Sequence, residues 1–322
     1  MLYPLSFHPI LKEKIWGGGK LKTLFGKISS AKNIGESWEL SGCEGDESVV
    51  ANGFLEGNNI SELVEVYMDK LVGYEVYQQF GTQFPLLFKF IDASQNLSIQ
   101  VHPNDEIASE RHNSCGKTEM WYVVDAEEDA ELIIGFANDS NKEDYQEAVE
   151  DGSVEELLQH IKVEKGNVFF IPAGLVHAIC KGVVIAEIQQ TNDITYRIYD
   201  YKRTDSDGNE RELHIEQALD VIDFSACKKP KIHPKKELNQ IILLVECEYF
   251  TVNLVQLDKA FTRNYGDIAS FKTYMCTEGS CEIEFADTKT LINKGDTLLI
   301  PACITEINIL PKTEVTLLET YI

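Results

Sequence analysis

The chain has 322 residues and a formal net charge of −24, with 53 Asp and Glu against 29 Lys and Arg. So acidic a chain argues against nucleic acid and anionic membranes as partners, because both require a basic surface. Its length predicts two domains rather than one, and its hydrophobic share of 43% is typical of globular proteins.

Targeting segments and disulfide bonds are not expected. The first eight residues lack the basic and apolar regions of a signal peptide, and no apolar run reaches the roughly 18 residues of a membrane span. Eight cysteines are spread along the chain without a CxxC pair, which favours reduced thiols. The sequence therefore predicts a cytoplasmic protein.

The first segment, residues 1–57, is rich in glycine and aromatic residues and predicts an irregular loop that leads into short strands. The first clear helix follows, with Asn59 or Ser61 as its N-cap and apolar residues at helical spacing as far as Leu71. Gly73 is expected to end this helix.

Strand patterns dominate the rest of the chain, interrupted by helical inserts and a linker. The strand-like runs are residues 85–101, 118–124, 131–135, 168–171, 183–186 and six runs between 241 and 318. An insert at 141–161 predicts helix, with Ser153 and Glu156 as a capping box. A short helix is expected around 214–222, and the basic, proline-punctuated residues 227–236 predict the linker.

One internal repeat connects the two halves. Residues 165–173 (KGNVFFIPA) and 294–302 (KGDTLLIPA) share a turn, a buried strand and a proline at the corner. Short strands with Gly and Asn turns indicate antiparallel barrels or sandwiches. We therefore predict a mainly β protein in which one antiparallel barrel occurs twice, with a few inserted helices. The predicted domains are residues 1–226 and 237–322.

The stretch LSIQVHP, residues 97–103, carries the strongest chemical signal. Its alternation predicts a half-buried strand whose apolar side chains share one face. Ser98, Gln100 and His102 share the other face, where three polar side chains are costly to bury unless something binds them. A metal ion is the candidate occupant.

A second histidine completes a recognisable pattern. The spacing G-x5-P-x-G-x2-H, which ends at His177, predicts a strand and a tight corner that aim this imidazole back into a barrel. Together with an upstream strand of polar residues and a glutamate, this pattern resembles the cupin family. Two departures are that Gln100 and His102 replace the usual His-x-His, and that Glu119 comes later than in the common pattern.

These departures fit one branch of the cupins, and the chain resembles the type I phosphomannose isomerases in their short bacterial form. The resemblance covers residues 10–205 and implies the two-barrel jelly-roll fold of cupins. The matching segments are residues 16–18, 36–39, 97–103, 117–119, 171–177 and 187, with an arginine ten residues after the last.

The resemblance implies one Zn²⁺ ion held by Gln100, His102, Glu119 and His177. Two imidazoles, a carboxylate and an amide oxygen suit such an ion, although spacing does not exclude Fe²⁺ or Mn²⁺. A site without thiolates that leaves room for a sugar oxygen is catalytic rather than structural. Gln100 is the weakest ligand in this set, because a neutral amide is a poor donor.

The same resemblance implies further roles. Ser98 and Lys117 would contact the substrate, and on a strand Lys117 would share the face of the ligand two residues later. Arg197 would stabilise developing negative charge, and Glu187 would be the catalytic base. Lys89, inside an apolar run, either points inward or lies at a sheet edge.

Other readings of these residues stay open at the level of sequence. Lys117 could be a surface lysine on a loop, and Arg197 could form an ion pair with Asp193 or Asp200. Glu187 could be a paired structural carboxylate, in which case a metal-bound hydroxide is the competing base.

The implied activity is the reversible interconversion of mannose 6-phosphate and fructose 6-phosphate. Such an aldose–ketose isomerisation passes through an enediol and needs a base and an electrophile. The alternatives are an iron cupin dioxygenase and a cupin that binds a sugar phosphate without turnover. The second barrel is predicted to hold no metal, because Glu306 stands where the first has His177. The oligomeric state is left open.

Overall fold

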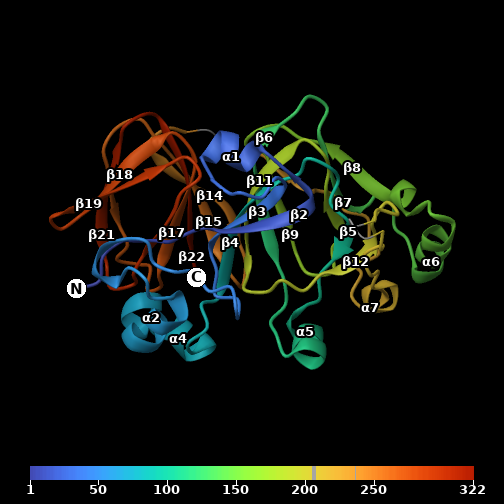
Figure 1. Ribbon diagram of the computed structural model, residues 1–322, viewed down its shortest axis with the longest axis horizontal. Helices are drawn as coiled ribbons and strands as arrows, with labels where there is room; N and C mark the ends of the chain where they lie inside the picture. Colours follow the sequence, from blue (N-terminus) through green and yellow to red (C-terminus); the bar gives the residue numbers. More distant parts are fainter. Residues whose placement is uncertain (205–207, 236) are drawn as a thin grey trace.

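The computed structural model describes residues 1–204, 208–235 and 237–322, so Lys236 of the predicted linker lies outside the described residues. Figure 1 shows two β-rich halves side by side. Strands make up 41% of the chain and helices 17%, which confirms the predicted mainly β class. Over the described ranges, no helix is long and apolar enough to cross a membrane. All eight cysteines fall within these ranges and are free thiols.

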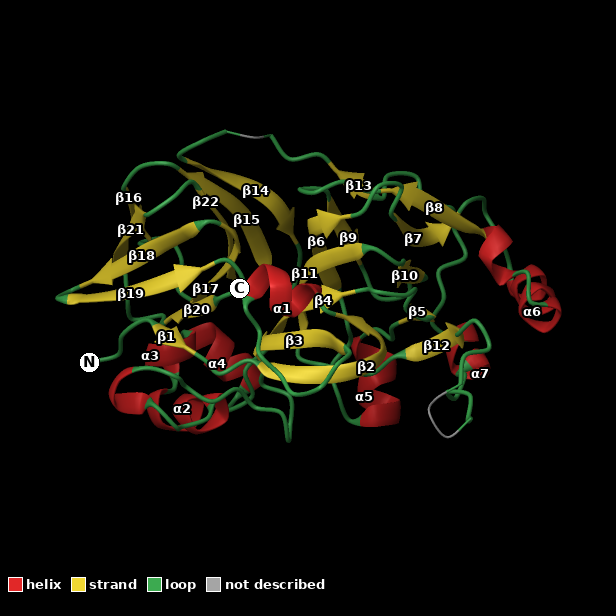
Figure 2. Cartoon of the chain, turned by 45° about the horizontal axis from the view of Figure 1, so that its top comes forward, coloured by secondary structure: helices red, strands yellow, loops and turns green. Residues whose placement is uncertain are grey.

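The first half is built from two antiparallel sheets (Figure 2). The larger has seven strands in the order β13-β9-β6-β11-β4-β3-β2: β2 (Ile10–Gly18), β3 (Ile34–Leu40), β4 (Leu86–Asp92), β6 (Glu119–Ala126), β9 (Val168–Ile171), β11 (Val183–Gln190) and β13 (Lys231–Ile232). The smaller has five in the order β12-β5-β10-β7-β8: β5 (Ile99–Val101), β7 (Glu131–Phe136), β8 (Leu158–Lys162), β10 (His177–Ile179) and β12 (Tyr196–Tyr199).

The second half repeats this two-sheet plan. Its six-stranded sheet has the order β1-β20-β17-β22-β15-β14: β1 (Leu5–Ser6), β14 (Gln240–Glu246), β15 (Thr251–Leu257), β17 (Lys272–Glu278), β20 (Thr297–Ile300) and β22 (Val315–Tyr321). The four-stranded sheet has the order β16-β21-β18-β19: β16 (Phe261–Asn264), β18 (Ser280–Phe285), β19 (Thr288–Asn293) and β21 (Glu306–Pro311).

Over the described residues, the predicted barrel of each half takes the form of two sheets that do not close on each other. Among the described residues every sheet keeps two unpaired edges, and no strand pairing joins the two sheets of a half. Two facing sheets bury a core between their inner faces without joining their edges, so closure is not needed for stability.

The start of the predicted first domain and part of the predicted linker form strands that pair into sheets. Strand β1, from the start of the chain, pairs with β20 of the second half, so it completes a sheet of that half. Within the predicted linker, Lys231 and Ile232 form β13 and pair with β9. The chain therefore crosses between the halves at both ends of the first half.

The helices lie outside the sheets: α1 (Lys20–Phe25), α2 (Ile60–Tyr67), α3 (Asp69–Val72), α4 (Tyr74–Phe80), α5 (Asp105–His112), α6 (Lys142–Asp151) and α7 (Ile215–Leu219). Asn59 caps α2: its side chain accepts from the backbone N–H of Glu62, and the Glu62 side chain accepts from the N–H of Asn59, each at 2.9 Å. This reciprocal capping box makes Asn59, not Ser61, the N-cap of the helix.

The helix predicted from Ser153 onward is wrong. The chain makes a short 3₁₀ turn at Val154–Leu157 and then forms β8, and the Ser153 side chain makes no capping hydrogen bond. Strand β8 pairs with β7 at the edge of the smaller sheet, so pairing to a distant strand overrides the local helical spacing.

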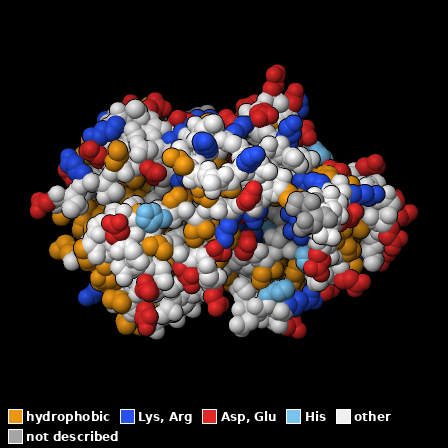
Figure 3. Space-filling model, in the orientation of Figure 1, with side chains coloured by type: hydrophobic (Ala, Val, Ile, Leu, Met, Phe, Trp, Pro, Cys, Tyr) orange, Lys and Arg blue, Asp and Glu red, His pale blue; other side chains and the backbone are white. Residues whose placement is uncertain are grey.

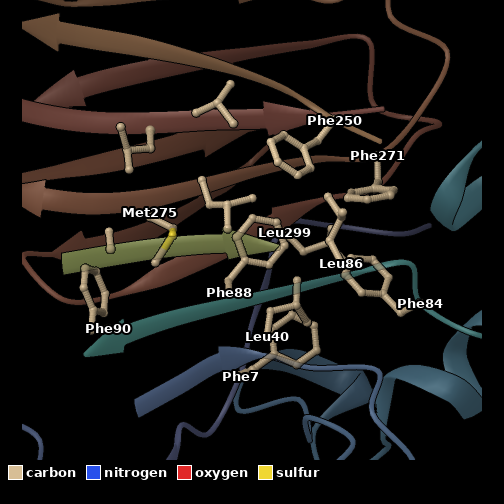
Figure 4. Close-up of a cluster of buried hydrophobic side chains, with 14 of the residues drawn as sticks. Phe7, Leu40, Phe84, Leu86, Phe88, Phe90, Phe250, Phe271, Met275 and Leu299 are labelled. Carbon is tan, nitrogen blue, oxygen red and sulfur yellow. The ribbon is translucent and has the colours of Figure 1, made fainter. Parts of the chain in front are cut away.

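One hydrophobic core is continuous between the halves. Figure 4 shows side chains from β4 of the first half packed against Phe250, Phe271, Met275 and Leu299 of the second. The rings of Phe84 and Phe271 lie 4.7 Å apart between centroids. Because these side chains are buried together, the two halves hold a fixed position relative to each other.

The internal repeat extends into neighbouring strands. Ile171 of β9 lies opposite Glu119 of β6. Ile300 of β20, which occupies the same place in the repeat, lies opposite Lys272 of β17. The second half therefore has a lysine at the position where the first half has a predicted metal ligand.

Candidate active site

Three predicted metal ligands meet between the two sheets of the first half. Glu119 begins β6 of the larger sheet, His177 begins β10 of the smaller one, and His102 follows β5. One donor atom from each lies within 4.8 Å of the others, and all three side chains are buried. Among the described residues, these three form the one group of His, Cys, Asp or Glu side chains that could hold a metal ion. The pairing of distant strands, which sequence could not specify, brings these donors together.

Backbone carbonyls fix how both imidazoles point. Nδ1 of His102 lies 3.0 Å from the carbonyl oxygen of Ile194, and Nδ1 of His177 lies 2.8 Å from that of Leu175. A carbonyl only accepts, so we assign the proton of each ring to Nδ1, and each Nε2 turns a lone pair toward the cluster. Nε2 of His102 lies 3.1 Å from Oε1 of Glu119 and has no hydrogen-bond partner among the described residues. Two buried acceptors that face each other favour a cation between them.

The protonation states suit a divalent cation. Burial lowers the pKa of His102 to about 3, assisted by the nearby Lys117 ammonium, and burial also lowers the pKa of His177. Burial alone would raise the pKa of Glu119, but His102 and Lys117 hold that pKa below its usual range. Neutral imidazoles and an ionised carboxylate are the forms that bind metal.

Gln100 reaches the edge of this cluster. On β5 it lies opposite His177 of β10, and its side-chain amide lies 3.4 Å from Nε2 of that histidine. The oxygen and nitrogen of an amide can exchange places by a flip, so this contact allows the oxygen to face the cluster. The position agrees with a fourth ligand, which remains a prediction.

A cavity of about 230 Å³ opens beside the cluster, and the predicted Ser98, Gln100, Lys117, Glu187 and Arg197 all line it. The complete lining is Lys14, Trp16, Glu36, Lys89, Ile91, Leu97, Ser98, Gln100, Lys117, Ile179, Glu187, Asp193, Thr195, Arg197 and Arg211. Five of these side chains are Lys or Arg and three are Asp or Glu, an excess of basic groups in a chain with net charge −24. On the face drawn in Figure 3, by contrast, basic side chains are interspersed with acidic ones. The cavity therefore concentrates positive charge, which favours an anionic ligand.

Glu187 is held by residues of both neighbouring strands. On β4, Lys89 lies opposite it, with Nζ 3.3 Å from Oε2, and on β6 the indole N–H of Trp121 donates to Oε1 at 2.9 Å. The same indole N–H also donates to Glu119 at 3.1 Å. Lys89 therefore points inward from an interior strand, 3.7 Å from Asp193 as well. Glu187 is thus a paired carboxylate that also lines the cavity.

The pKa of Glu187 is raised to about 7. Burial is the main cause and the negative charge of Glu119 adds to it, while Lys89 and Lys117 oppose it. Burial alone would lower the pKa of Lys89, but Glu187 and the other carboxylates around it raise that pKa. The lysine therefore stays charged, and Glu187 can exchange a proton near neutral pH.

The stability of the metal-free protein is expected to reflect this raised pKa. Because the pKa in the folded chain exceeds the ordinary 4.5, the bound proton stabilises the fold at low pH, and this contribution is lost as pH rises through about 7. Glu187→Gln imitates the protonated carboxyl, so its melting temperature should rise relative to that of the unsubstituted chain from about pH 5 to about pH 8. Calorimetry in the presence of a chelator measures this difference. A constant difference across that range would contradict the raised pKa.

Arg197 is not in either of the ion pairs considered from the sequence. Its Nη1 donates to the backbone carbonyl of Glu212 at 2.8 Å, and its buried Nε has no partner among the residues that are described. Asp200 is instead shared by Arg203 and Arg211, with Nε of Arg211 at 2.7 Å. The Arg197 guanidinium therefore keeps unused donors beside the cavity.

Lys117 and Ser98 are both buried at 4% exposure, so Lys117 is not the surface lysine of the alternative reading, although it does lie in the loop before β6. The ammonium of Lys117 lies 3.4 Å from Oε1 of Glu119. Lys117 lies beside the ligand and in the cavity wall, as expected, but it precedes β6, which begins at Glu119, so strand alternation does not place it there.

Sequence reasoning missed several residues of this site. Glu36 accepts from the indole N–H of Trp38 at 2.7 Å and pairs with Lys14 at 3.0 Å, at one side of the cavity. Arg211 lines another part of the wall. The segment that contains Glu36 matched a family motif, which could have marked it, whereas nothing local distinguished Arg211 from other surface arginines.

Two family models match this chain. Residues 5–148 match "Phosphomannose isomerase type I, catalytic domain", and residues 240–318 match "Mannose-6-phosphate isomerase, cupin domain". The second match identifies the two-sheet second half as a cupin domain.

Curated proteins and a solved structure agree with these matches. The chain is 38% identical to Mannose-6-phosphate isomerase ManA of Bacillus subtilis over 301 residues, which cover 92% of this chain and 93% of that protein. It is 35% identical to a mannose-6-phosphate isomerase of Streptococcus mutans, over 94% of this chain and 93% of that one. The crystal structure of the mannose 6-phosphate isomerase from Bacillus subtilis superposes with a TM-score of 0.90 at 34% identity, with 100% of both chains covered.

Proposed function

This chain belongs to the type I phosphomannose isomerase family and is an isomerase, and from that premise we propose that it interconverts mannose 6-phosphate and fructose 6-phosphate in the cytoplasm with the help of Zn²⁺. The observation that carries the proposal is the buried cluster of His102, Glu119 and His177 beside a cavity whose lining includes five Lys and Arg side chains. The reaction moves one proton between C2 and C1 and a second between the oxygens on those carbons, and it leaves the phosphate unchanged.

The cluster fits one Zn²⁺ ion, with Gln100 as a fourth ligand. The fit rests on the buried donor atoms of His102, Glu119 and His177, which lie within 4.8 Å of one another, and on Nε2 of His102, which has no hydrogen-bond partner among the described residues. A bound Zn²⁺ ion would polarise the carbonyl and hydroxyl oxygens at C1 and C2 and so favour the enediol.

Glu187 is our candidate for the base that moves the proton between C2 and C1. It lines the cavity, and Lys89 and Trp121 hold one carboxylate oxygen each. A pKa of about 7 makes it able to accept and return a proton near neutral pH. Lys89 also keeps a positive charge beside the carboxylate, which limits the energy needed to ionise it in a buried site.

Arg197 and Lys117 are assigned the role of stabilising negative charge on the substrate. Arg197 lies opposite Gln100 on the neighbouring strand, so its unused donors are next to the predicted metal. There it would stabilise charge that develops on the enediol oxygens. Lys117 and Ser98 would contact the bound sugar phosphate.

The phosphate group is assigned to the arginine end of the cavity. Arg197 and Arg211 both line this end of the cavity, where the one carboxylate that pairs with Arg211 is Asp200, and burial together with the charge of Arg211 lowers the pKa of Arg197. This excess of guanidinium over carboxylate favours a dianion, which guanidinium groups bind in a bidentate manner.

Arg211→Met is expected to raise KM for mannose 6-phosphate on the order of tenfold or more, with a smaller effect on kcat, because a phosphate contact is lost while the reacting carbons keep their neighbours. Steady-state kinetics measure the two constants. Arg203→Met is the matched control, since Arg203 also pairs with Asp200 but does not line the cavity. Equal effects of the two substitutions on KM would contradict the assignment.

The proposed activity is tested directly. Purified protein is incubated with mannose 6-phosphate, and fructose 6-phosphate is measured before chelation, after chelation and after Zn²⁺ is restored. Product that disappears with chelation and returns with Zn²⁺ is expected. Absence of product from the Zn²⁺-loaded protein would refute the proposal.

We propose that the second half holds no metal. At the position of Glu119 it has Lys272, whose buried ammonium would repel a cation. The glutamate that it keeps at the position of Glu187 is Glu319, which accepts from Arg263 at 2.8 Å and from Tyr274 at 2.6 Å. These protein donors already neutralise that carboxylate.

A further inference from the structure

The segment that carries Lys117 into β6 is held by its backbone. The N–H of Lys117 donates to the carbonyl of Pro103 at 3.1 Å, and the N–H of Thr118 donates to the side chain of Gln190 at 2.9 Å. The N–H of Gly116 donates to Oδ1 of Asp105 at 2.6 Å. These contacts determine where Lys117 and the following ligand, Glu119, enter the cavity.

Asp105, the first residue of α5, is the shared acceptor of this network. Its Oδ1 accepts from Gly116 and also from the side-chain amide of Gln190 at 3.0 Å. Gly116 lies so close to the start of α5 that an added Cβ would be 2.7 Å from the backbone nitrogen of Asp105. The start of α5 and the segment before β6 are therefore in close contact, and the Asp105 carboxylate lies against Gly116.

The other oxygen of Asp105 is held from the second half of the molecule. The hydroxyl of Tyr249, 144 residues away in the sequence, donates to Oδ2 at 2.7 Å. Tyr249 lies in the turn between β14 and β15, and the next residue, Phe250, is 1% exposed in the core that both halves share (Figure 4). The turn is therefore anchored, and its hydroxyl has a fixed place.

We propose that Tyr249 is a positioning residue for the catalytic site, and that the second half contributes to activity through it. The proposal rests on the isomerase function proposed above. By donating to one oxygen of Asp105, Tyr249 orients the other oxygen toward Gly116 and Gln190. That orientation fixes the backbone from which Lys117 and Glu119 project. It gives the second half a role in the chemistry without any contact with substrate.

The variant that tests this is Tyr249→Phe in the full chain, which keeps the ring and removes only the hydroxyl. The kcat/KM of the Zn²⁺-loaded protein for mannose 6-phosphate should fall on the order of tenfold, because a hydrogen bond to a charged acceptor is lost and the site loosens. Amide hydrogen exchange of the metal-free protein in residues 115–119 should become faster by about the same factor. Hydrogen exchange is measured without substrate turnover. If the unsubstituted protein is inactive, the isomerase function is refuted, while the exchange of residues 115–119 still tests the positioning by Tyr249.

Tyr3→Phe is the matched control. The Tyr3 hydroxyl donates to the carbonyl of Asn52 at 2.7 Å and accepts from the N–H of Leu55 at 3.0 Å, away from the Asp105 network. It should lower the melting temperature while kcat/KM and the exchange of residues 115–119 stay within twofold of the unsubstituted chain, an expectation for independent sites.

A double-mutant cycle with Asp105→Ala separates positioning from general destabilisation. If Tyr249 acts through Asp105, Tyr249→Phe should have no further effect on kcat/KM once Asp105 is alanine. If the fold-changes in kcat/KM of the two single substitutions instead multiply in the double variant, the proposal is overturned. An unchanged exchange rate of residues 115–119 in the Tyr249→Phe protein would also overturn it.

Discussion

Replacement of His177 by alanine is expected to empty the metal site and abolish turnover. The substitution removes one of three buried donors that lie within 4.8 Å of one another, and it leaves only Glu119, His102 and the weakly donating amide of Gln100 to hold the ion. Loss of residues that only support ligands weakens metal binding by ~10–100-fold, so loss of a ligand itself should exceed about 100-fold. Metal content after dialysis, measured by mass spectrometry beside kcat, tests this expectation.

His160→Ala is the control for His177→Ala. His160 lies on β8 with 40% of its side chain exposed and pairs with Glu131, away from the cavity. It should retain one metal ion per chain and the activity of the unsubstituted protein. A His177→Ala protein that keeps stoichiometric Zn²⁺ through dialysis would show that this histidine is not a ligand.

Arg197→Ala is expected to separate metal binding from catalysis. The guanidinium lines the cavity and makes no ion pair within the described ranges, so its removal leaves the three buried ligands in place. If it stabilises negative charge on the enediol oxygens, kcat should fall by about 10²–10³-fold at unchanged metal content, as for the loss of one oxyanion donor. Arg197→Lys keeps the charge without the planar fork and should recover only part of the rate.

Arg111→Ala serves as the control for Arg197→Ala. Its guanidinium pairs with Asp220 at the surface and lies outside the cavity lining, so kcat should not change. Loss of Zn²⁺ or of the folded state in Arg197→Ala would instead make Arg197 a structural residue, held by the carbonyl of Glu212.

Local patterns in the sequence predicted much of the strand content and the face on which Ser98, Gln100 and His102 lie. This worked because strand periodicity is a property of consecutive residues. The same logic failed for residues 153–161, where helical spacing gave way to pairing of β8 with β7. It also could not decide whether Lys89 points inward, since that depends on whether β4 is an interior strand.

Residue types and their spacing along the chain are enough to predict the mainly β class, the repeat, and a metal centre with the pattern of one family. Which polar groups meet depends on the fold: Lys89 pairs with Glu187, Asp200 pairs with two arginines, and Tyr249 donates to Asp105. Each of these contacts requires a particular strand register or packing between segments far apart in the chain. Charge interactions change steeply over a few ångströms, which residue spacing along a sequence does not specify.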